Sequence, residues 1–179
     1  MENKQLIDNL FNKYRPIQRR EEMLWLLDKI GNPKTIVEIG VQKGGTLKLW
    51  EQLGETVIGI DTEDQIGWNY EDKAIFIKGD SHKIETKQKL EKILKGRKID
   101  FFFQDADHSY EGVKKDFKMY KDLVDGIICY ADIEYHPNRE DVGVDRFWKE
   151  IKKEYKTDER IIPSSVDHVG CCGLGIIYV

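Results

Sequence analysis

Five acidic residues each stand at or near the end of a short apolar run. They are Glu38, Asp61, Asp80, Asp105 and Asp132. Such runs predict strands of a parallel sheet, and ligands of open parallel sheets bind just beyond the carboxyl ends of the strands. A single aspartate is common in turns and at helix starts, but acidic residues at the ends of five successive strands predict a pocket for a small molecule.

The segment 38–46 (Glu-Ile-Gly-Val-Gln-Lys-Gly-Gly-Thr) follows the first run and opens a helical pattern. Its glycines let a ligand approach the backbone closely. Because it lacks the Gly-x-Gly-x-x-Gly spacing of dinucleotide sites, it disfavours an NAD-dependent oxidoreductase, and its acid suits a positively charged ligand. Asp61 lies 21 residues after Gly40, where a carboxylate can accept both hydroxyls of a ribose. Together these features suit a nucleoside that carries a positive charge, and S-adenosylmethionine is such a molecule.

The apolar runs alternate with helical patterns, which is typical of β-α-β units. Seven runs are predicted to be strands: 35–40, 56–61, 74–80, 99–105, 126–132, 160–163 and 173–179. Helical spacing covers 23–30, 47–53, 81–96, 113–124 and 144–155. Ser109 is a candidate N-cap of the fourth of these helices. No helix clearly separates the last two strands. The pattern predicts an α/β fold with a largely parallel sheet.

The chain has 179 residues, the size of one domain. Residues 1–16 are predicted to form an amphipathic helix, an appendage to a single domain of residues 17–179. Lys and Arg total 29 against 33 Asp and Glu, a formal charge of −4 that disfavours a nucleic-acid partner. The basic stretch 83–98 is a candidate phosphate-binding patch, but its Glu–Lys pairs, spaced four residues apart, favour a solvated helix face.

The sequence also bears on the cellular compartment. No apolar run approaches the roughly 20 residues of a membrane span, and the polar N-terminus has no signal-peptide core. The three cysteines are Cys129 and the adjacent pair Cys171 and Cys172. Neighbours in sequence rarely meet disulfide geometry, and no Cys-x-x-Cys spacing suggests zinc. We expect reduced thiols in a cytoplasmic protein without a membrane partner. The oligomeric state stays open, a homo-oligomer included.

Motifs at the ends of the predicted strands form a recognisable set. They are Val37-Glu38-Ile39-Gly40 with Gly44-Gly45, Asp61, Gly79-Asp80-Ser81, the string Asp105-Ala106-Asp107-His108-Ser109-Tyr110-Glu111-Gly112-Val113 with Asp116, and Ala131-Asp132-Ile133. On these motifs the chain, from about Ile17 onward, resembles the class I S-adenosylmethionine-dependent methyltransferases. It is most similar to a small branch that includes cephalosporin-hydroxylase-like proteins and sugar O-methyltransferases. The resemblance implies a Rossmann-like fold: a seven-stranded, mostly parallel sheet with a reversed last hairpin and helices on both faces.

The resemblance also implies a role for individual residues. The implied cofactor-binding residues are Glu38, Gly40, Gly44, Gly45, Asp61, Asp80, Ser81 and Asp105. The first four would surround the methionine portion of S-adenosylmethionine, Asp61 would hold the ribose, and Asp80 with Ser81 would flank the adenine. Asp105 would face the methionine end and the acceptor. The implied activity is methylation of a hydroxyl group on a small polar acceptor, such as a saccharide.

A hydroxyl acceptor must lose its proton, to a general base or through a metal that lowers its pKa. His108, with Asp105, is the predicted catalytic group, because it follows the fourth strand and histidine titrates near neutral pH. The alternative is a surface histidine that caps the next helix. Mg²⁺ is a second candidate, held by the oxygens of Asp105 and Asp132, with Asp107 as a further ligand.

Ala131 weakens the metal site that the resemblance implies. Related sequences place a histidine or an acid immediately before the last aspartate, where this chain has Ala131. Glu134 or His136, from the loop that follows, could supply the missing ligand. The same replacement leaves a second hypothesis open, a non-catalytic or decayed protein of the same fold that binds S-adenosylmethionine or another nucleoside.

Overall fold

The structure is a computed structural model that describes residues 2–64, 74–135, 139–162 and 173–179. Cys171, Cys172 and His136, which the sequence analysis singled out, lie outside the described residues. Cys129 is buried and carries a free thiol. None of the described helices is both long enough and apolar enough to cross a membrane.

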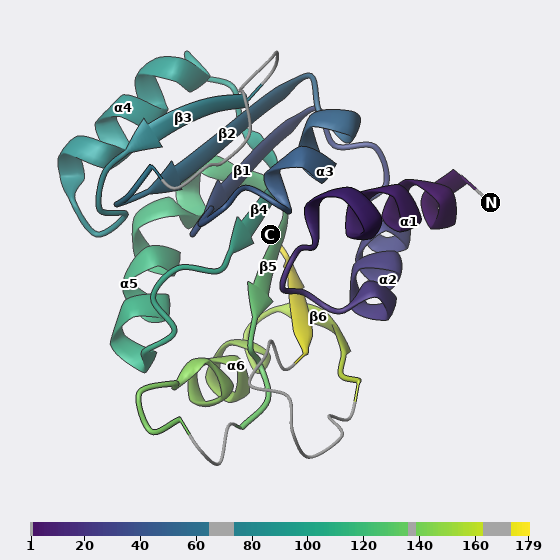
Figure 1. Cartoon of the computed structure of the whole chain (residues 1–179). Coiled ribbons are helices and arrows are strands. Elements are labelled where there is room, and N and C mark those ends of the chain that lie inside the picture. Colours follow the sequence, from purple (N-terminus) through teal and green to yellow (C-terminus); the bar gives the residue numbers. More distant parts are fainter. Residues whose placement is uncertain (1, 65–73, 136–138, 163–172) are drawn as a thin grey trace.

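The described strands form one seven-stranded sheet in the order β3-β2-β1-β4-β5-β7-β6 (Figure 1). Their bounds are β1 Thr35–Ile39, β2 Thr56–Asp61, β3 Ala74–Lys78, β4 Ile99–Gln104, β5 Val124–Ala131, β6 Lys156–Arg160 and β7 Leu174–Tyr178. β1 to β5 pair in parallel, whereas β7 runs antiparallel to both β5 and β6. The mostly parallel sheet with a reversed last hairpin is thereby confirmed.

The direction in which strands are added changes between β1 and β4. The chain runs outward from β1 to β2 and β3, then returns across the sheet to pair β4 with the other side of β1. In open α/β sheets such a reversal opens a crevice at the carboxyl ends of the two strands. Gly40 and Asp105 directly follow β1 and β4, so both residues lie at this crevice.

Helices cover both faces of the sheet, as the resemblance implied (Figure 1). The described α-helices are α1 Glu2–Tyr14, α2 Arg20–Ile30, α3 Leu47–Leu53, α4 Ile84–Leu94, α5 Tyr110–Tyr120 and α6 Val144–Ile151. Neighbouring strand residues point to opposite faces. Ile36 therefore packs into the core with α1, α2 and α3, while Val37 packs into the core with α4, α5 and α6.

α1 packs against α2 and α3. Ile7 and Leu10 on α1 are buried in the core that these helices share. Asn3 Nδ2 donates a hydrogen bond to Asp28 Oδ1 on α2 at 3.0 Å. The expected domain boundary between residues 16 and 17 stays a prediction. The short segment 15–19 joins α1 to α2.

Two predicted boundaries near the C-terminus are wrong. The sixth strand is Lys156–Arg160 rather than 160–163, and the last helix ends at Ile151 rather than 155. β6 lies at the edge of the sheet, where one side faces solvent, so it lacks the continuous apolar run that marks the inner strands. The prediction included Tyr155 because it follows Ile151 at helical spacing, but Tyr155 lies beyond the helix, where its ring packs against Phe117 with 5.8 Å between the ring centroids.

Candidate functional site

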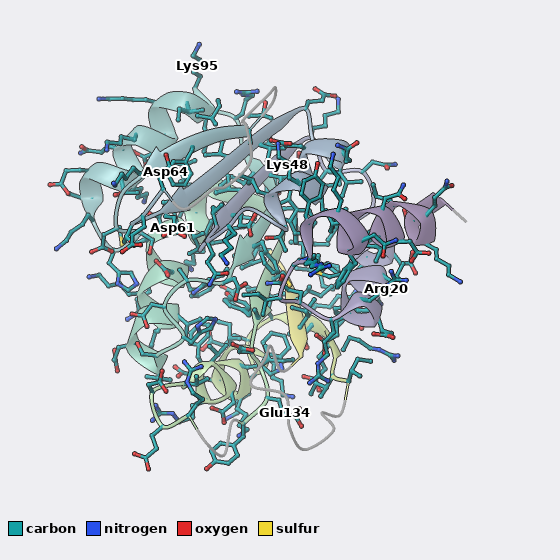
Figure 2. The ribbon with its side chains drawn as sticks, in the orientation of Figure 1. Arg20, Lys48, Asp61, Asp64, Lys95 and Glu134 are labelled. Carbon is teal, nitrogen blue, oxygen red and sulfur yellow. The ribbon has the colours of Figure 1, made fainter. Side chains whose placement is uncertain are left out.

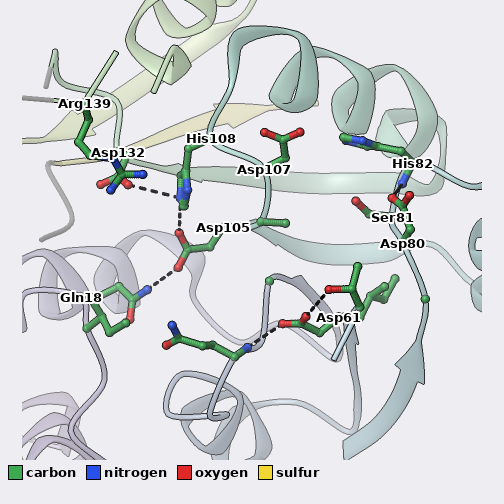
Figure 3. Close-up of a pocket in the computed structure, with 17 residues that line it drawn as sticks. Gln18, Asp61, Asp80, Ser81, His82, Asp105, Asp107, His108, Asp132 and Arg139 are labelled. Atoms are coloured by element: carbon green, nitrogen blue, oxygen red, sulfur yellow. Dashed lines mark hydrogen bonds and ion pairs between the residues drawn. The ribbon is translucent and has the colours of Figure 1, made fainter. Parts of the chain in front are cut away.

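A cavity of about 690 Å³ lies at the carboxyl ends of the parallel strands (Figure 3). Its volume is in the range of sites for small molecules. The predicted site residues that line it are Gly40, Asp61, Asp80, Ser81, Asp105, His108 and Asp132. The structure therefore brings together most of the residues selected from the sequence. Of the residues predicted for the cofactor, Glu38, Gly44 and Gly45 lie outside its lining and shape the adjoining loop.

Gly40 begins that loop in a conformation that only glycine adopts easily. Its φ is +83°, and a Cβ atom there would lie 2.0 Å from the carbonyl oxygen of Asp105. Gly44, with φ +77°, closes a turn by donating its N–H to the Val41 carbonyl at 2.8 Å. The loop therefore passes directly against the end of β4, with no side chain between Gly40 and Asp105.

Glu38 supports the loop from within the protein. Its side chain is fully buried on β1, and its Oε1 accepts a hydrogen bond from Thr46 Oγ1 beyond the loop. Burial raises the pKa of Glu38 well above 4.5, and the nearby carboxylates of Asp105 and Asp61 raise it further, against the hydrogen bond from Thr46. Contact of Glu38 with a cofactor stays a prediction.

Asp61 ends β2 with its carboxylate at the cavity wall. Its Oδ2 accepts the backbone N–H of Gln42 at 2.8 Å, and its Oδ1 accepts the N–H of Glu63 at 3.1 Å. These contacts join the end of β2 to the loop that follows β1. The side chain is therefore fixed between two loops, and its contact with a ribose stays a prediction.

The loop after β3 is held in place by α5. Tyr120 donates its hydroxyl to the Ser81 carbonyl at 2.7 Å, and the N–H of His82 donates to Asp80 Oδ1 at 2.8 Å. His82 Nε2 lies 3.4 Å from Asp116 Oδ1, on the buried side of the loop. Burial raises the pKa of Asp116 from 3.8 to about 6. Asp80 and Ser81 are thus presented to the cavity on a fixed backbone.

His108 lies between two carboxylates (Figure 3). Its Nε2 is 3.0 Å from Asp105 Oδ1 and 3.3 Å from Asp132 Oδ2. Burial by itself lowers the pKa of His108, but the hydrogen bond and charge of Asp105, together with the charge of Asp132, outweigh burial and raise it. Burial also raises the pKa of Asp105, against its hydrogen bonds with His108 and Gln18.

The alternative role of His108 as a helix cap is not what the structure shows. Ser109 is the N-cap of α5, because its Oγ accepts the N–H of Gly112 at 3.0 Å. This confirms the predicted cap and leaves the imidazole of His108 directed at Asp105 and Asp132.

The described residues do not fit a Mg²⁺ site. The oxygens of Asp105 and Asp132 that would face a cation both lie against His108 Nε2, which occupies the space between them. Within the described ranges, no group of three or more His, Cys, Asp or Glu residues is arranged to hold a metal. Glu134, an alternative ligand from the sequence, is exposed on the loop after β5 (Figure 2).

The cavity also contains residues that the sequence analysis did not select. Gln18 and Ile17 reach it from the segment between α1 and α2. Gln18 Nε2 donates to Asp105 Oδ2 at 2.6 Å, across 87 positions of sequence. Neither residue stands at the end of a strand, so the pattern that found the acids could not find them. Arg139 also lines the cavity, from the loop before α6, and pairs with Asp141 through two hydrogen bonds of 2.9 and 2.7 Å.

Known structures share this fold at low sequence identity. An O-methyltransferase from Bacillus cereus in complex with S-adenosylhomocysteine is 18% identical, with 98% of this chain and 90% of that chain covered and a TM-score of 0.64. An rRNA methylase from Streptococcus thermophilus is 8% identical, with 92% and 99% covered and a TM-score of 0.64. At these identities the likeness shows the fold alone, and the fold serves acceptors of different classes.

A larger protein shares the fold over part of its length. The MycE methyltransferase of the mycinamycin biosynthetic pathway, in complex with Mg and S-adenosylhomocysteine, is 16% identical with a TM-score of 0.64. The match covers 99% of this chain but 54% of MycE, so the chain spans about half the length of that protein. No curated protein sequence matches the chain.

A family model, described as a methyltransferase domain, matches residues 37–133, more than half of the chain. The matched region runs from β1 to just beyond Asp132. It contains the glycine loop, Asp61, the loop after β3 and the cluster of Asp105, His108 and Asp132. The chain therefore belongs to the methyltransferase domain family.

Proposed function

We propose that the chain is an S-adenosylmethionine-dependent O-methyltransferase that acts on a hydroxyl group of a small polar acceptor, such as a saccharide. The observation that carries this proposal is a histidine at the cavity wall, His108, held between Asp105 and Asp132 at 3.0 and 3.3 Å. Family membership supports methyl transfer, and the S-adenosylhomocysteine bound to the Bacillus cereus O-methyltransferase supports the cofactor.

The residues at the cavity fit S-adenosylmethionine. Asp61 offers a fixed carboxylate for the ribose, and Asp80 with Ser81 would lie beside the adenine. The loop that starts at Gly40 would run along the methionine portion, because the absence of a side chain there lets a ligand approach the backbone. The acidic lining favours a cationic sulfonium. When bound, the cofactor supplies an electrophilic methyl carbon.

His108 acts as the general base in this proposal. Its Nε2 is engaged by Asp105, so the other ring nitrogen, Nδ1, takes the proton from the acceptor hydroxyl. The positive charge that then forms on the ring is stabilised by the carboxylates of Asp105 and Asp132. Asp105 and Asp132 also fix the orientation of the ring, and the cavity wall positions the acceptor oxygen for in-line attack.

The charges at the cavity favour an acceptor without negative charge. Five aspartates line it, namely Asp61, Asp80, Asp105, Asp107 and Asp132. The guanidinium of Arg139 is paired with Asp141, which reduces its attraction for an anionic group. A phosphorylated or acyl-phosphate acceptor would therefore be repelled, whereas a neutral polyol would not.

A second candidate function is a non-catalytic protein that binds S-adenosylmethionine or another nucleoside. Ala131 favours it, because related sequences have an acid or histidine at this position. In that case the cavity would bind the cofactor or its product, while no acceptor would be methylated.

Two measurements separate these functions. Calorimetry with S-adenosylhomocysteine, with and without Mg²⁺, tests whether the cavity binds the product of the cofactor; absence of binding would contradict both functions. Transfer of labelled methyl groups to a panel of neutral sugars and other hydroxyl compounds tests catalysis. We expect transfer to at least one neutral compound and its loss in His108→Gln, with S-adenosylhomocysteine binding kept. Binding without any transfer would favour the second function.

A further inference from the structure

Gln18 contacts Asp105 on the side of the carboxylate that faces away from His108 (Figure 3). The residue is only 6% exposed, and its Nε2 donates to Asp105 Oδ2 at 2.6 Å. The other oxygen of the same carboxylate, Oδ1, lies 3.0 Å from His108 Nε2. One carboxylate is therefore held on both of its oxygens, by an amide and by an imidazole.

The backbone that carries Gln18 is anchored on both sides. On one side Pro16 covers the glycine loop so closely that a Cβ atom on Gly45 would lie 3.1 Å from Pro16 Cα. On the other side Arg19 Nη1 donates to the Ile162 carbonyl, and the N–H of Ile162 donates to Glu22 Oε1 at 3.1 Å. The segment between α1 and α2 thus forms a wall of the cavity, and Gln18 projects from a fixed point of it.

The chemistry of an amide suits this position. A glutamine side chain donates a hydrogen bond without adding charge, so Asp105 keeps its negative charge for His108. A lysine in the same place would cancel that charge. Without any donor, Oδ2 of Asp105 would be left unpaired in a half-buried place, and the carboxyl group could rotate to satisfy it. Rotation would move Oδ1 away from His108.

We propose that Gln18 is a positioning residue of the active site, whose amide holds the Asp105 carboxylate in the orientation that fixes His108. The inference rests on the proposed function, because it gives Gln18 a part in methyl transfer. Gln18 acts through Asp105 and touches neither the proton that moves nor the methyl group.

Two variants and one matched control test this role. Gln18→Met keeps the length of the side chain and removes the amide, and Gln18→Glu keeps its shape but offers no donor to Asp105. Gln88→Glu makes the same chemical change on the exposed side of α4. We expect kcat to fall about tenfold or more in both Gln18 variants, because misplacement of a catalytic group by a fraction of an ångström has effects of this size. The affinity for S-adenosylhomocysteine should stay within about threefold, and Gln88→Glu should match the wild type.

A second measurement does not depend on turnover. The ring ¹⁵N signals of His108 should shift in both Gln18 variants, because the hydrogen bond to Asp105 changes. The signals of His82 should stay in place, since that ring is held by the Gly112 carbonyl at 3.2 Å and by Asp116. If the wild type methylates no acceptor, the proposed function fails, and the His108 signals alone decide whether Gln18 positions this cluster.

Several results would overturn the proposal. Unchanged His108 signals, or an unchanged kcat in an active enzyme, would show that Gln18 does not position the cluster. A loss of S-adenosylhomocysteine affinity as large as the loss of kcat would make Gln18 a cofactor-binding residue instead. If both Gln18 variants unfold while Gln88→Glu does not, Gln18 is a structural residue.

Discussion

Gly40 and Asp105 meet backbone to backbone where β1 and β4 end. The N–H of Asp105 donates to the Ile39 carbonyl at 2.9 Å, and a Cβ atom on Gly40 would lie 2.0 Å from the Asp105 carbonyl oxygen. The glycine loop and the aspartate that holds His108 are therefore one structural unit. Any side chain at position 40 must push them apart.

This contact predicts a large effect for Gly40→Ala. The new methyl group would clash with the Asp105 backbone and also sit at a positive φ, so we expect the free energy of unfolding to fall by about 3 kcal/mol or more. Gly96→Ala is the matched control, because Gly96 has φ +82° but nothing within 4 Å of its Cβ position. It should lose only about 1 kcal/mol. Urea unfolding followed by circular dichroism measures both; equal losses would contradict the close approach.

Asp61→Asn tests the ribose assignment. The amide can keep the hydrogen bond from the Gln42 N–H but has no charge, and one of its two polar atoms no longer accepts a hydroxyl. We expect the Kd for S-adenosylhomocysteine to rise about tenfold or more, because charge-assisted hydrogen bonds are lost. Asp64→Asn is the control, since Asp64 is exposed in the same loop (Figure 2). Calorimetry gives both constants, and an unchanged Kd in Asp61→Asn would remove the assignment.

The raised pKa of His108 predicts the pH dependence of methyl transfer. Burial lowers this pKa, but the hydrogen bond and charge of Asp105 and the charge of Asp132 raise it above 6.5 overall. A base works only when it is neutral, so kcat/KM, which reports the pKa of the free enzyme, should fall as pH decreases through the raised pKa. The midpoint of the acidic limb should therefore lie above 6.5. A pH–rate profile with a midpoint below that value would contradict His108 as the base.

The same shift predicts a pH-dependent contribution of His108 to stability. Because the folded protein binds the His108 proton more tightly than the unfolded chain, the contribution is fully present below pH 6.5 and is lost as pH rises through the folded pKa. The stability advantage of the wild type over His108→Gln should therefore be larger at acidic pH than at alkaline pH. Urea unfolding of both proteins across this range measures the difference, and a constant difference would argue against the ion pairs.

The raised pKa of Asp116 predicts that the stability of the protein also depends on pH in a more acidic range. This pKa is raised from 3.8 to about 6 by burial, against the charge of His82, while the charge of Asp107 raises it further. Its stabilising contribution is present below pH 3.8 and is lost as pH rises through about 6. Relative to Asp116→Asn, the wild type should therefore lose on the order of 1–3 kcal/mol over this range.

Urea unfolding at several pH values tests this prediction for Asp116. Asp125→Asn, at an exposed aspartate near the start of β5, is the matched control, and its stability curve should run parallel to that of the wild type. If the stability curve of Asp116→Asn also runs parallel to that of the wild type, the buried carboxyl does not take up a proton on folding.

The elements of this fold that the sequence predicted well are those with a local physical cause. Inner strands such as β4 are buried on both faces, so they appear as continuous apolar runs. Ser109 caps α5 through a contact with Gly112 only three residues away, which the sequence pattern contains directly. β6 was misplaced because an edge strand needs no apolar residues on its exposed side.

The amino-acid sequence by itself determined the alternation of strands and helices and the acids at the strand ends, because backbone geometry and burial impose short periods on nearby residues. Only the tertiary structure decided which groups meet at the cavity. Gln18 contacts Asp105 across 87 positions, and His108 lies beside Asp132 from another strand. Such contacts depend on how the helices and strands are placed in space, and a single glutamine between two helices has no local pattern that could reveal its partner.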